Sequence, residues 1–429
     1  MHPARKHGKD LRRADPREGA DKTNHRRVRP RRHARCGSST SIRICAGIHP
    51  ACWRKWLNRN LVFVALALLT WGFGEGLFFN FQPIYLKELG SSEAEIGLIL
   101  GAFGAAMAIT HIPAGRLADR IGRRPLLVFA WLTGLVSTII MAVARELPLF
   151  IVGMMGYGLT AFVASPLGSY VTAARGNWSV GTALSMTTAT FNMGMVLGPI
   201  TGGWIGDHFG LRAVYFVAAG MFVLSTLFVL LIQNQPIDDH DPESPPVSLL
   251  NNTRLKSFLS VVAFAVFAMY IGQPLTPNFL EDVRDLSLSS IGFVFALGAL
   301  GNAILALTLS RLKPHIGFVL AQVMVAAFAL IIWRGTGAPI LALGYFLLGG
   351  FRAARPLAMA QARSLVHQSQ MGLTYGVMET IYAVIFILAP PLAGLIYERD
   401  PFLTYQLALV LIAVSVVISA IVPRRLLNA

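Results

Sequence analysis

The stretch AGRLADRIGRRPLL, residues 114–127, places four arginines and an aspartate between two long apolar runs. Arginine is costly to place in lipid, and short loops rich in Arg and Lys stay on the cytoplasmic side of a membrane. Gly115 and Gly122 permit a tight turn and a close approach of the flanking helices. The stretch therefore predicts a short cytoplasmic loop between two membrane-crossing helices.

The composition of the whole chain agrees with this prediction. Of the 429 residues, 54% are hydrophobic and 14% are charged, and the mean hydropathy is +0.58. Soluble domains carry about 25% charged residues, so this chain has too few polar side chains to cover a water-exposed surface. We therefore expect lipid to solvate most of the chain.

Apolar runs of about 20 residues, long enough to cross the membrane as helices, recur from Leu61 onward. Barrel strands would be shorter and would alternate in polarity, which these runs do not. The sequence predicts an all-α polytopic membrane protein with twelve spans, at residues 61–84, 94–114, 125–144, 148–171, 182–205, 212–233, 257–279, 290–310, 316–334, 338–361, 372–396 and 402–423.

One long polar segment, Asn234–Ser257, divides the spans into two sets of six. It is rich in Pro, Asp and Ser, which is typical of a flexible linker. The predicted organisation is a basic, disordered tail (1–60), an N-terminal six-helix bundle (61–233), a cytoplasmic linker (234–256), a C-terminal six-helix bundle (257–423) and a short cytoplasmic tail (424–429).

The two halves resemble each other in three places that follow the same order. QPIYLKELGSSEAEIG (82–97) resembles TPNFLEDVRDLSLSSIG (276–292), GRLADRIG (115–122) resembles SRLKPHIG (310–317), and LGPITGGWIGD (197–207) resembles LAPPLAGLIYE (388–398). Such repeats indicate two pseudo-symmetric bundles related by an axis normal to the membrane. In this arrangement a binding site lies between the bundles near the midplane.

The first 60 residues carry 17 of the 37 Lys and Arg residues against four acidic residues, and they contain all three cysteines. The basic segment could bind anionic lipid, act as a transit peptide, or be dispensable and translated from a start codon set too far upstream. Basic residues in the remaining loops number twelve on one side and six on the other, which predicts that both termini are cytoplasmic in a multi-pass protein of the cell membrane.

The run from Gly115 to Arg124 resembles the loop signature of the major facilitator superfamily. The resemblance implies a twelve-span transporter of two six-helix bundles that works by alternating access. It also implies that Asp119 and Arg123 latch the halves on the cytoplasmic side in the outward-open state, while simple membrane anchoring would suffice for Arg116, Arg120 and Arg124. The candidate gating motif comprises Gly115, Asp119, Arg120, Gly122, Arg123 and Arg124.

GMVLGPITGG, residues 194–203, resembles a signature of the family's antiporters. Gly194, Gly198 and Gly202 recur every four residues, so small residues on one face could let helices pack closely, and Pro199 can kink the helix. The candidate packing motif is Gly194, Gly198, Pro199, Gly202 and Gly203, although ordinary small-residue packing is an alternative interpretation. The resemblance favours efflux of a drug or metabolite.

One departure weakens the likeness to drug–proton antiporters. These relatives often carry an arginine, linked to proton coupling, three residues before a Gly-x-Gly in span 4. This chain has Gly153 at that place, before Gly156-Tyr157-Gly158. The usual arginine of drug–proton antiport is therefore absent.

Ionisable residues inside spans are costly and are functional candidates by default. Glu75 is the proton-coupling candidate, and Arg352 or Arg355 would bind an anionic substrate group or hold Glu75 charged in one state. A permanent Arg355–Glu379 structural pair is the alternative. The substrate-cavity candidates, some of which lie in spans that the family fold places around the cavity, are Arg352, Arg355, Glu379, Tyr157 and Gln273. Weaker candidates are Trp71, Asn80, Tyr270, Tyr345, Tyr375 and Tyr382.

The sequence thus predicts a secondary active transporter of a small organic solute, with proton-coupled efflux favoured. Uptake symport of a nutrient or organic anion, and a non-transporting receptor or scaffold on the same fold, are alternatives. We expect no enzyme activity, cofactor, metal site or nucleic-acid partner, because no phosphate-binding loop, metal-spaced cluster or nucleophile elbow is present in the body. The expected partners are the solute, protons or another coupling ion, and the bilayer, with the protein as a monomer.

Overall fold

The computed structural model describes residues 58–235, 252–366 and 371–428, and within them it leaves out the side chains of 111–121, 372 and 422–428. The predicted tail up to residue 57 and most of the predicted linker, residues 236–251, lie outside the described residues. The helices of the two predicted bundles lie within the described residues.

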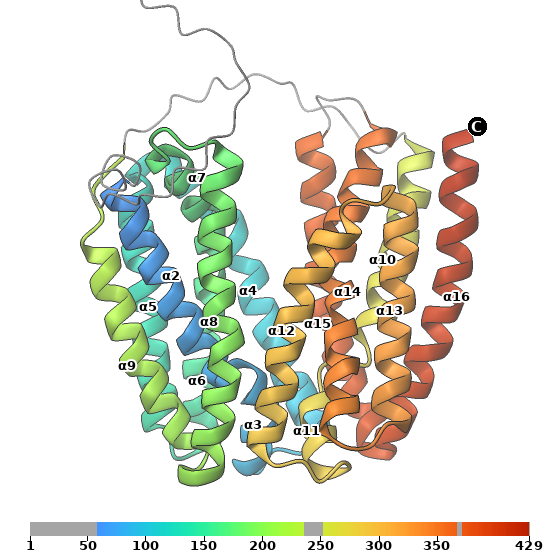
Figure 1. Cartoon of the computed structure of the whole chain (residues 1–429), viewed down its shortest axis with the longest axis horizontal. Coiled ribbons are helices and arrows are strands. Elements are labelled where there is room, and N and C mark those ends of the chain that lie inside the picture. Colours follow the sequence, from blue (N-terminus) through green and yellow to red (C-terminus); the bar gives the residue numbers. More distant parts are fainter. Residues whose placement is uncertain (1–57, 236–251, 367–370, 429) are drawn as a thin grey trace, which may run out of the picture. The chain divides into compact units, whose positions relative to one another are not determined.

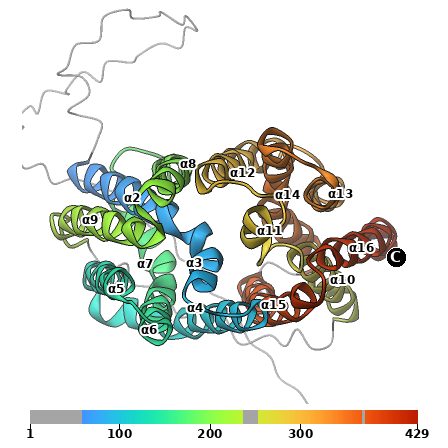
Figure 2. The same cartoon turned by 90° about the horizontal axis from the view of Figure 1, so that it is seen from below.

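Helices make up both halves of the described chain. The N-terminal half contains α2 (Arg59–Phe78), α3 (Gln82–Glu88), α4 (Glu93–Ile121), α5 (Arg123–Val143), α6 (Leu147–Gly158), α7 (Ala164–Ala174), α8 (Val180–Phe209) and α9 (Leu211–Leu230). The C-terminal half contains α10 (Thr253–Tyr270), α11 (Thr276–Asp282), α12 (Leu288–Leu309), α13 (Pro314–Arg334), α14 (Ala338–Ala362), α15 (Met371–Arg399) and α16 (Pro401–Asn428). The two halves form separate groups of helices (Figures 1 and 2), and the predicted all-α fold is confirmed.

Ten stretches of the described chain are long and apolar enough to cross a membrane. Helices α8 and α14 have the length but are less apolar. Gly and Thr recur along α8, whereas α14 carries Arg352 and Arg355. Both helices can still cross if their polar faces lie against protein rather than lipid, which is where polar residues of membrane helices are found.

Short breaks interrupt the helix in three of the predicted spans. A short 3-10 segment follows α2 before Pro83, another follows α6 before Pro166, and a turn separates α10 from α11 just before Pro277. Proline lacks an N–H and cannot bond the carbonyl four residues earlier, so the helix tightens or breaks there. The predicted spans at 61–84 and 148–171 each correspond to one membrane-length stretch, Arg59–Glu88 and Leu147–Ala174, whereas the predicted span at 257–279 takes in most of α10 and the start of α11.

The turn in the arginine-rich stretch is also shorter than predicted. Helix α4 continues through Gly115 to Ile121, and α5 begins at Arg123. Gly122 alone makes the turn, with a φ of +84° that suits glycine. The prediction that Gly115 lies in a loop is wrong, whereas Gly122 has the predicted conformational role.

The repeat seen in the sequence recurs in the hydrogen bonding of the two halves. Asn58 caps α2 and donates its side-chain amide to the Ala174 carbonyl at 2.9 Å. Asn252 caps α10 in the same way and donates to the Leu365 carbonyl at 3.0 Å. Each cap ties the start of the half's first span to the end of its fourth span.

The two halves meet at the end that carries α3 and α11, which we call the outer end because the predicted orientation places it outside (Figure 1). There a Cβ on Gly97 would lie 2.5 Å from the Pro390 carbonyl oxygen, and one on Gly292 would collide with the Pro199 carbonyl oxygen. These are the same contact made on two sides of the pseudo-symmetry axis. The ribbons diverge toward the opposite, inner end (Figure 1), so these glycine contacts join the halves at the outer end.

Candidate functional site

Glu75 lies in α2, and two neutral donors from the N-terminal half hold its carboxylate. The Trp71 indole N–H and the Tyr157 hydroxyl both donate to Oε2, at 3.0 and 2.9 Å. Trp71 is one helical turn from Glu75, whereas Tyr157 comes from the end of α6. The two hydrogen bonds favour the charged form of the carboxylate, while its partial burial disfavours that form.

An aromatic cluster fixes the position of these donors. Trp71 stacks on Tyr157 with ring centroids 6.0 Å apart and packs against Trp131 and Phe222 at 5.0 and 4.4 Å. Gly134 leaves the space that the Trp71 ring occupies, because a Cβ there would collide with it. Rigid packing of this kind keeps the carboxylate in one place.

In the C-terminal half, Arg355 of α14 makes a bidentate pair with Glu379 of α15. The Arg355 Nε donates to Glu379 Oε1 at 2.9 Å, and a terminal guanidinium nitrogen contacts the other carboxylate oxygen. The guanidinium also lies 5.4 Å from the centre of the Tyr382 ring. Both charged side chains stay half exposed, at 47% and 41%, so the pair does not lie in a packed core.

Arg352 lies one turn earlier on α14 and has different surroundings. Its charge interacts with Glu75 of the other half and with Tyr270. Neither interaction is a salt bridge or a hydrogen bond among the described side chains. Tyr270 is itself stacked on Phe351, with centroids 5.7 Å apart. The structure thus assigns Arg355 to Glu379 and leaves Arg352 as the cation that acts on Glu75.

We expect the Arg355–Glu379 pair to behave as an exchangeable ion pair. Arg355→Glu alone sets two carboxylates against each other and should destabilise the protein by about 1 kcal/mol, as for other half-exposed pairs. Adding Glu379→Arg should restore most of the loss, because the pair is re-formed with reversed polarity. Thermal unfolding of the purified protein measures both effects. A double variant no more stable than Arg355→Glu would contradict the pairing.

Gln273 lies in the turn between α10 and α11 and donates its side-chain amide to the Met269 carbonyl at 2.7 Å. Tyr345 is buried between Phe295 and Phe328, which makes it a packing residue. The Gln273 amide thus satisfies a backbone carbonyl at the C-terminus of α10. Its contact with a substrate stays a prediction.

The candidate gating motif is described only in part. Gly115 lies within α4, and the side chains of Asp119 and Arg120 lie outside the described part of the chain. Arg124 donates to the Leu230 carbonyl at 3.2 Å, at the last turn of α9. A cation at a helix C-terminus is favourable, so Arg124 joins α5 to α9 within one half. The latch role of Asp119 and Arg123 stays a prediction.

The candidate packing motif faces two neighbours. A Cβ on Gly194, Gly198 or Gly202 would lie within 3.0 Å of the α2 backbone, in the same half. A Cβ on Gly203 would lie equally close to the backbone of Leu288 in the other half. The sequence analysis did not single out Gly292, which packs on Pro199 and Gly203, or its counterpart Gly97, which packs on Pro390 of α15, although their matching places in the repeat were a signal.

The position where antiporters carry an arginine has no room for one here. A Cβ on Gly153 would lie 2.9 Å from the Ser137 carbonyl oxygen and 2.8 Å from the Met141 side chain. Helix α6 therefore packs directly on α5 at this point. The departure seen in the sequence is thus explained by the close packing of α6 on α5.

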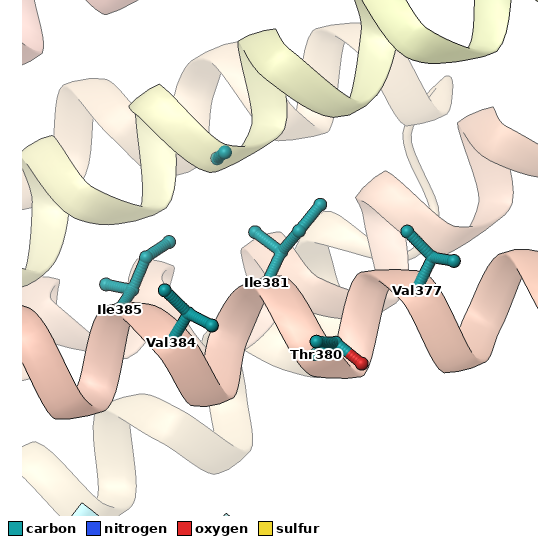
Figure 3. Close-up of a pocket in the computed structure, with 6 residues that line it drawn as sticks. Val377, Thr380, Ile381, Val384 and Ile385 are labelled. Atoms are coloured by element: carbon teal, nitrogen blue, oxygen red, sulfur yellow. The ribbon is translucent and has the colours of Figure 1, made fainter. Parts of the chain in front are cut away.

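One cavity of about 280 Å³ lies between α10 and α15 (Figure 3). Its lining residues are Ala263, Val377, Thr380, Ile381, Val384 and Ile385. Apart from the Thr380 hydroxyl, these side chains are apolar, and Glu75, Arg352 and Arg355 are not among them. Solute sites need a few convergent polar groups, so we place the candidate site at the charged residues and not in this cavity.

A sequence model of the Major Facilitator Superfamily matches residues 62–330. An uncharacterised MFS-type transporter of Methanocaldococcus jannaschii is 23% identical over 283 residues, covering 62% of this chain and 71% of that protein. The multidrug resistance protein MdtG of Salmonella arizonae is 27% identical over 317 residues, covering 68% of this chain and 77% of that protein.

Solved structures share the fold. The nucleoside transporter NupG superposes with a TM-score of 0.70 at 14% identity, covering 86% of this chain and 98% of that chain. The human organic anion transporter MFSD10 superposes with a TM-score of 0.62 at 17% identity, covering 84% of this chain and 99% of that chain. At such identities the likeness establishes the arrangement of helices and not the solute.

Proposed function

The chain belongs to the major facilitator superfamily, and we propose that it exports a small organic solute in exchange for protons. It is a multi-pass integral membrane protein and a secondary transporter, as its family is. The resemblance noted from the Gly115–Arg124 signature is thereby confirmed. The direction of transport, the coupling ion and the class of solute are the parts that we propose.

The observation that carries the proposal is the setting of Glu75. Its carboxylate sits in α2 among an indole, a phenol and the charge of Arg352 across the interface. A solute or a rearrangement that moves Arg352 changes the electrostatic stabilisation of the carboxylate, so proton binding and solute binding can alternate. The likeness to proteins named for multidrug resistance supports export.

The charges bordering the interface bear on the solute class. Arg352 is exposed, and Arg355 is half exposed beside Glu379. An anionic or zwitterionic solute could pair with Arg352 while its apolar part contacts Tyr270 and Phe351. We therefore expect organic anions or zwitterions to be preferred over organic cations.

Proteoliposomes containing the full chain test the proposal. With protons exchanged for solute, an acidic lumen should drive solute accumulation, and an alkaline lumen should not. A panel of labelled organic anions, zwitterions, neutral compounds and cations identifies the class. Accumulation driven by an alkaline lumen would establish symport instead. Transport unaffected by either gradient would contradict proton coupling.

A further inference from the structure

The outer end of the interface contains an ion-pair network that joins the two halves. Lys87 at the end of α3 pairs with Asp282 of α11 at 2.7 Å and with Glu93 of α4 at 3.0 Å. Asp282 belongs to the C-terminal half, whereas Lys87 and Glu93 belong to the N-terminal half. Separating the outer ends of the two halves must break the Lys87–Asp282 pair.

The internal repeat sets a second pair across the same interface. In the matched segments 82–97 and 276–292, Lys87 corresponds to Glu281 and Glu88 corresponds to Asp282. The pseudo-symmetric counterpart of the Lys87–Asp282 contact is therefore Glu281 facing Glu88. The charges agree with this placement, because Glu88 acts electrostatically on Glu281. By the repeat, the Lys87–Asp282 salt bridge on one side of the axis corresponds to the carboxyl groups of Glu88 and Glu281 on the other.

Other groups around Glu281 do not neutralise it. Asp282 is its neighbour in the chain, and Lys87 is engaged by Asp282 and Glu93. Tyr397 of α15 is 3% exposed, feels the charges of Glu281 and Asp282, and has a buried hydroxyl with no partner in the described part of the chain. Burial, together with the charges of Asp282 and Glu88, raises the pKa of Glu281 to about 7, and Lys87 opposes the rise only in part.

We propose that the Glu88–Glu281 pair is a proton-binding site of the outer gate, which holds a proton while the outer ends of α3 and α11 are together and releases it when they separate. Two carboxyl groups brought together cannot both stay ionised cheaply, so closure takes up a proton. This site requires alternating access but does not require Glu75 to carry the coupled proton.

The direction of the pH effect follows from linkage. In the open gate Glu281 is hydrated and far from Glu88, so we expect its pKa to return to about 4.3. The closed gate then binds the proton more tightly, and lowering the pH favours closure. Between about pH 7.5 and about pH 5.5, the ratio of closed to open protein should rise on the order of tenfold. An acidic exterior would thus close the outer side after solute release.

Distance measurements between spin labels at the outer end test this site. Labels attached at Arg145→Cys and Thr336→Cys report the separation of the halves, since these exposed loop residues follow α5 and α13. The three cysteines of the first 60 residues are replaced by Ser. The full chain in lipid nanodiscs, without solute and in a Glu75→Gln background, should shift from longer to shorter distances as the pH falls.

Glu281→Gln should abolish this shift, and Glu88→Gln should move its midpoint to lower pH, because each removes one of the facing carboxyl groups. Asp207→Asn is the matched control. Asp207 accepts hydrogen bonds from Leu288 N and Ser289 N of the other half, both at 2.8 Å, so its loss should favour opening similarly at both pH values. An undiminished shift in Glu281→Gln would overturn the proposal. So would a shift that follows the sodium concentration at constant pH.

Because the Glu75→Gln background removes the proposed coupling carboxylate, the gate measurement and the transport assay can fail independently. A pH response of the outer distances without proton-driven transport would leave the gate site standing and reject Glu75 as the carrier. If the parent protein shows proton-driven transport but the outer label distances do not change with pH, the gate site alone is rejected. Thermal unfolding of Glu281→Gln and Glu88→Gln verifies that both variants fold.

Discussion

Replacing Glu75 with glutamine should abolish solute accumulation driven by a pH gradient while leaving exchange of labelled for unlabelled solute intact. Glutamine has nearly the shape of glutamate and keeps an oxygen that accepts from Trp71 and Tyr157. It cannot release or bind a proton near neutral pH. For one-for-one exchange, a gradient of about one pH unit supports about tenfold accumulation, and we expect Glu75→Gln to reduce this to about onefold.

Two further variants distinguish the role of the Glu75 carboxyl group in binding a proton from the role of its hydrogen bonds. Trp71→Phe and Tyr157→Phe each remove one donor to the Glu75 oxygen but keep the carboxylate and most of the aromatic packing. Both should retain accumulation and shift its pH dependence, because the charged form loses a partner. If Glu75→Gln still accumulates solute against the gradient, or if the phenylalanine variants lose coupling as completely, Glu75 is not the proton carrier.

The fold could be predicted from the sequence because its signals are local. Apolar runs of membrane-spanning length, and glycines and arginines at fixed spacing around Asp119, need no knowledge of distant contacts. The interruptions before Pro83, Pro166 and Pro277 were missed because hydropathy stays high across them. The prolines themselves were the signal, since each removes a hydrogen bond from the preceding turn.

The candidate site could be predicted only as a set of separate charges. Glu75 and Arg352 stand out because ionisable residues are rare inside spans. The partners of Glu75 could not be predicted, since Tyr157 lies 82 residues away in the chain. In the sequence, Trp71 and Tyr157 look like the other aromatic residues of the spans, because only the packing shows that they donate to Glu75. Arg352 and Arg355 lie three residues apart on α14 but interact with different acids, Glu75 and Glu379. This difference likewise could not be predicted, because it depends on how α15 packs against α14.

Alanine at either of two adjacent glycines of α8, Gly202 and Gly203, should have a large but different effect. A Cβ on Gly202 would lie within 3.0 Å of the Leu77 backbone in α2, and one on Gly203 equally close to the Leu288 backbone. The steric conflict is nearly the same, but Leu77 belongs to the same half as Gly202, whereas Leu288 belongs to the other half. Overpacking of this kind costs about 1–3 kcal/mol. Gly202→Ala should lower the stability of the folded bundle by that amount.

Gly203→Ala should instead leave the bundle folded and disfavour outer closure, because the two halves can relieve the clash by separating. The same 1–3 kcal/mol corresponds to about a 5- to 150-fold shift toward the outward-open state. Thermal unfolding and the outer-end label distances measure the two effects. Gly220→Ala is the control, since open space surrounds that position in α9. Equal loss of stability in Gly202→Ala and Gly203→Ala, with unchanged distances in both, would mean that the α8–α12 contact does not open during transport.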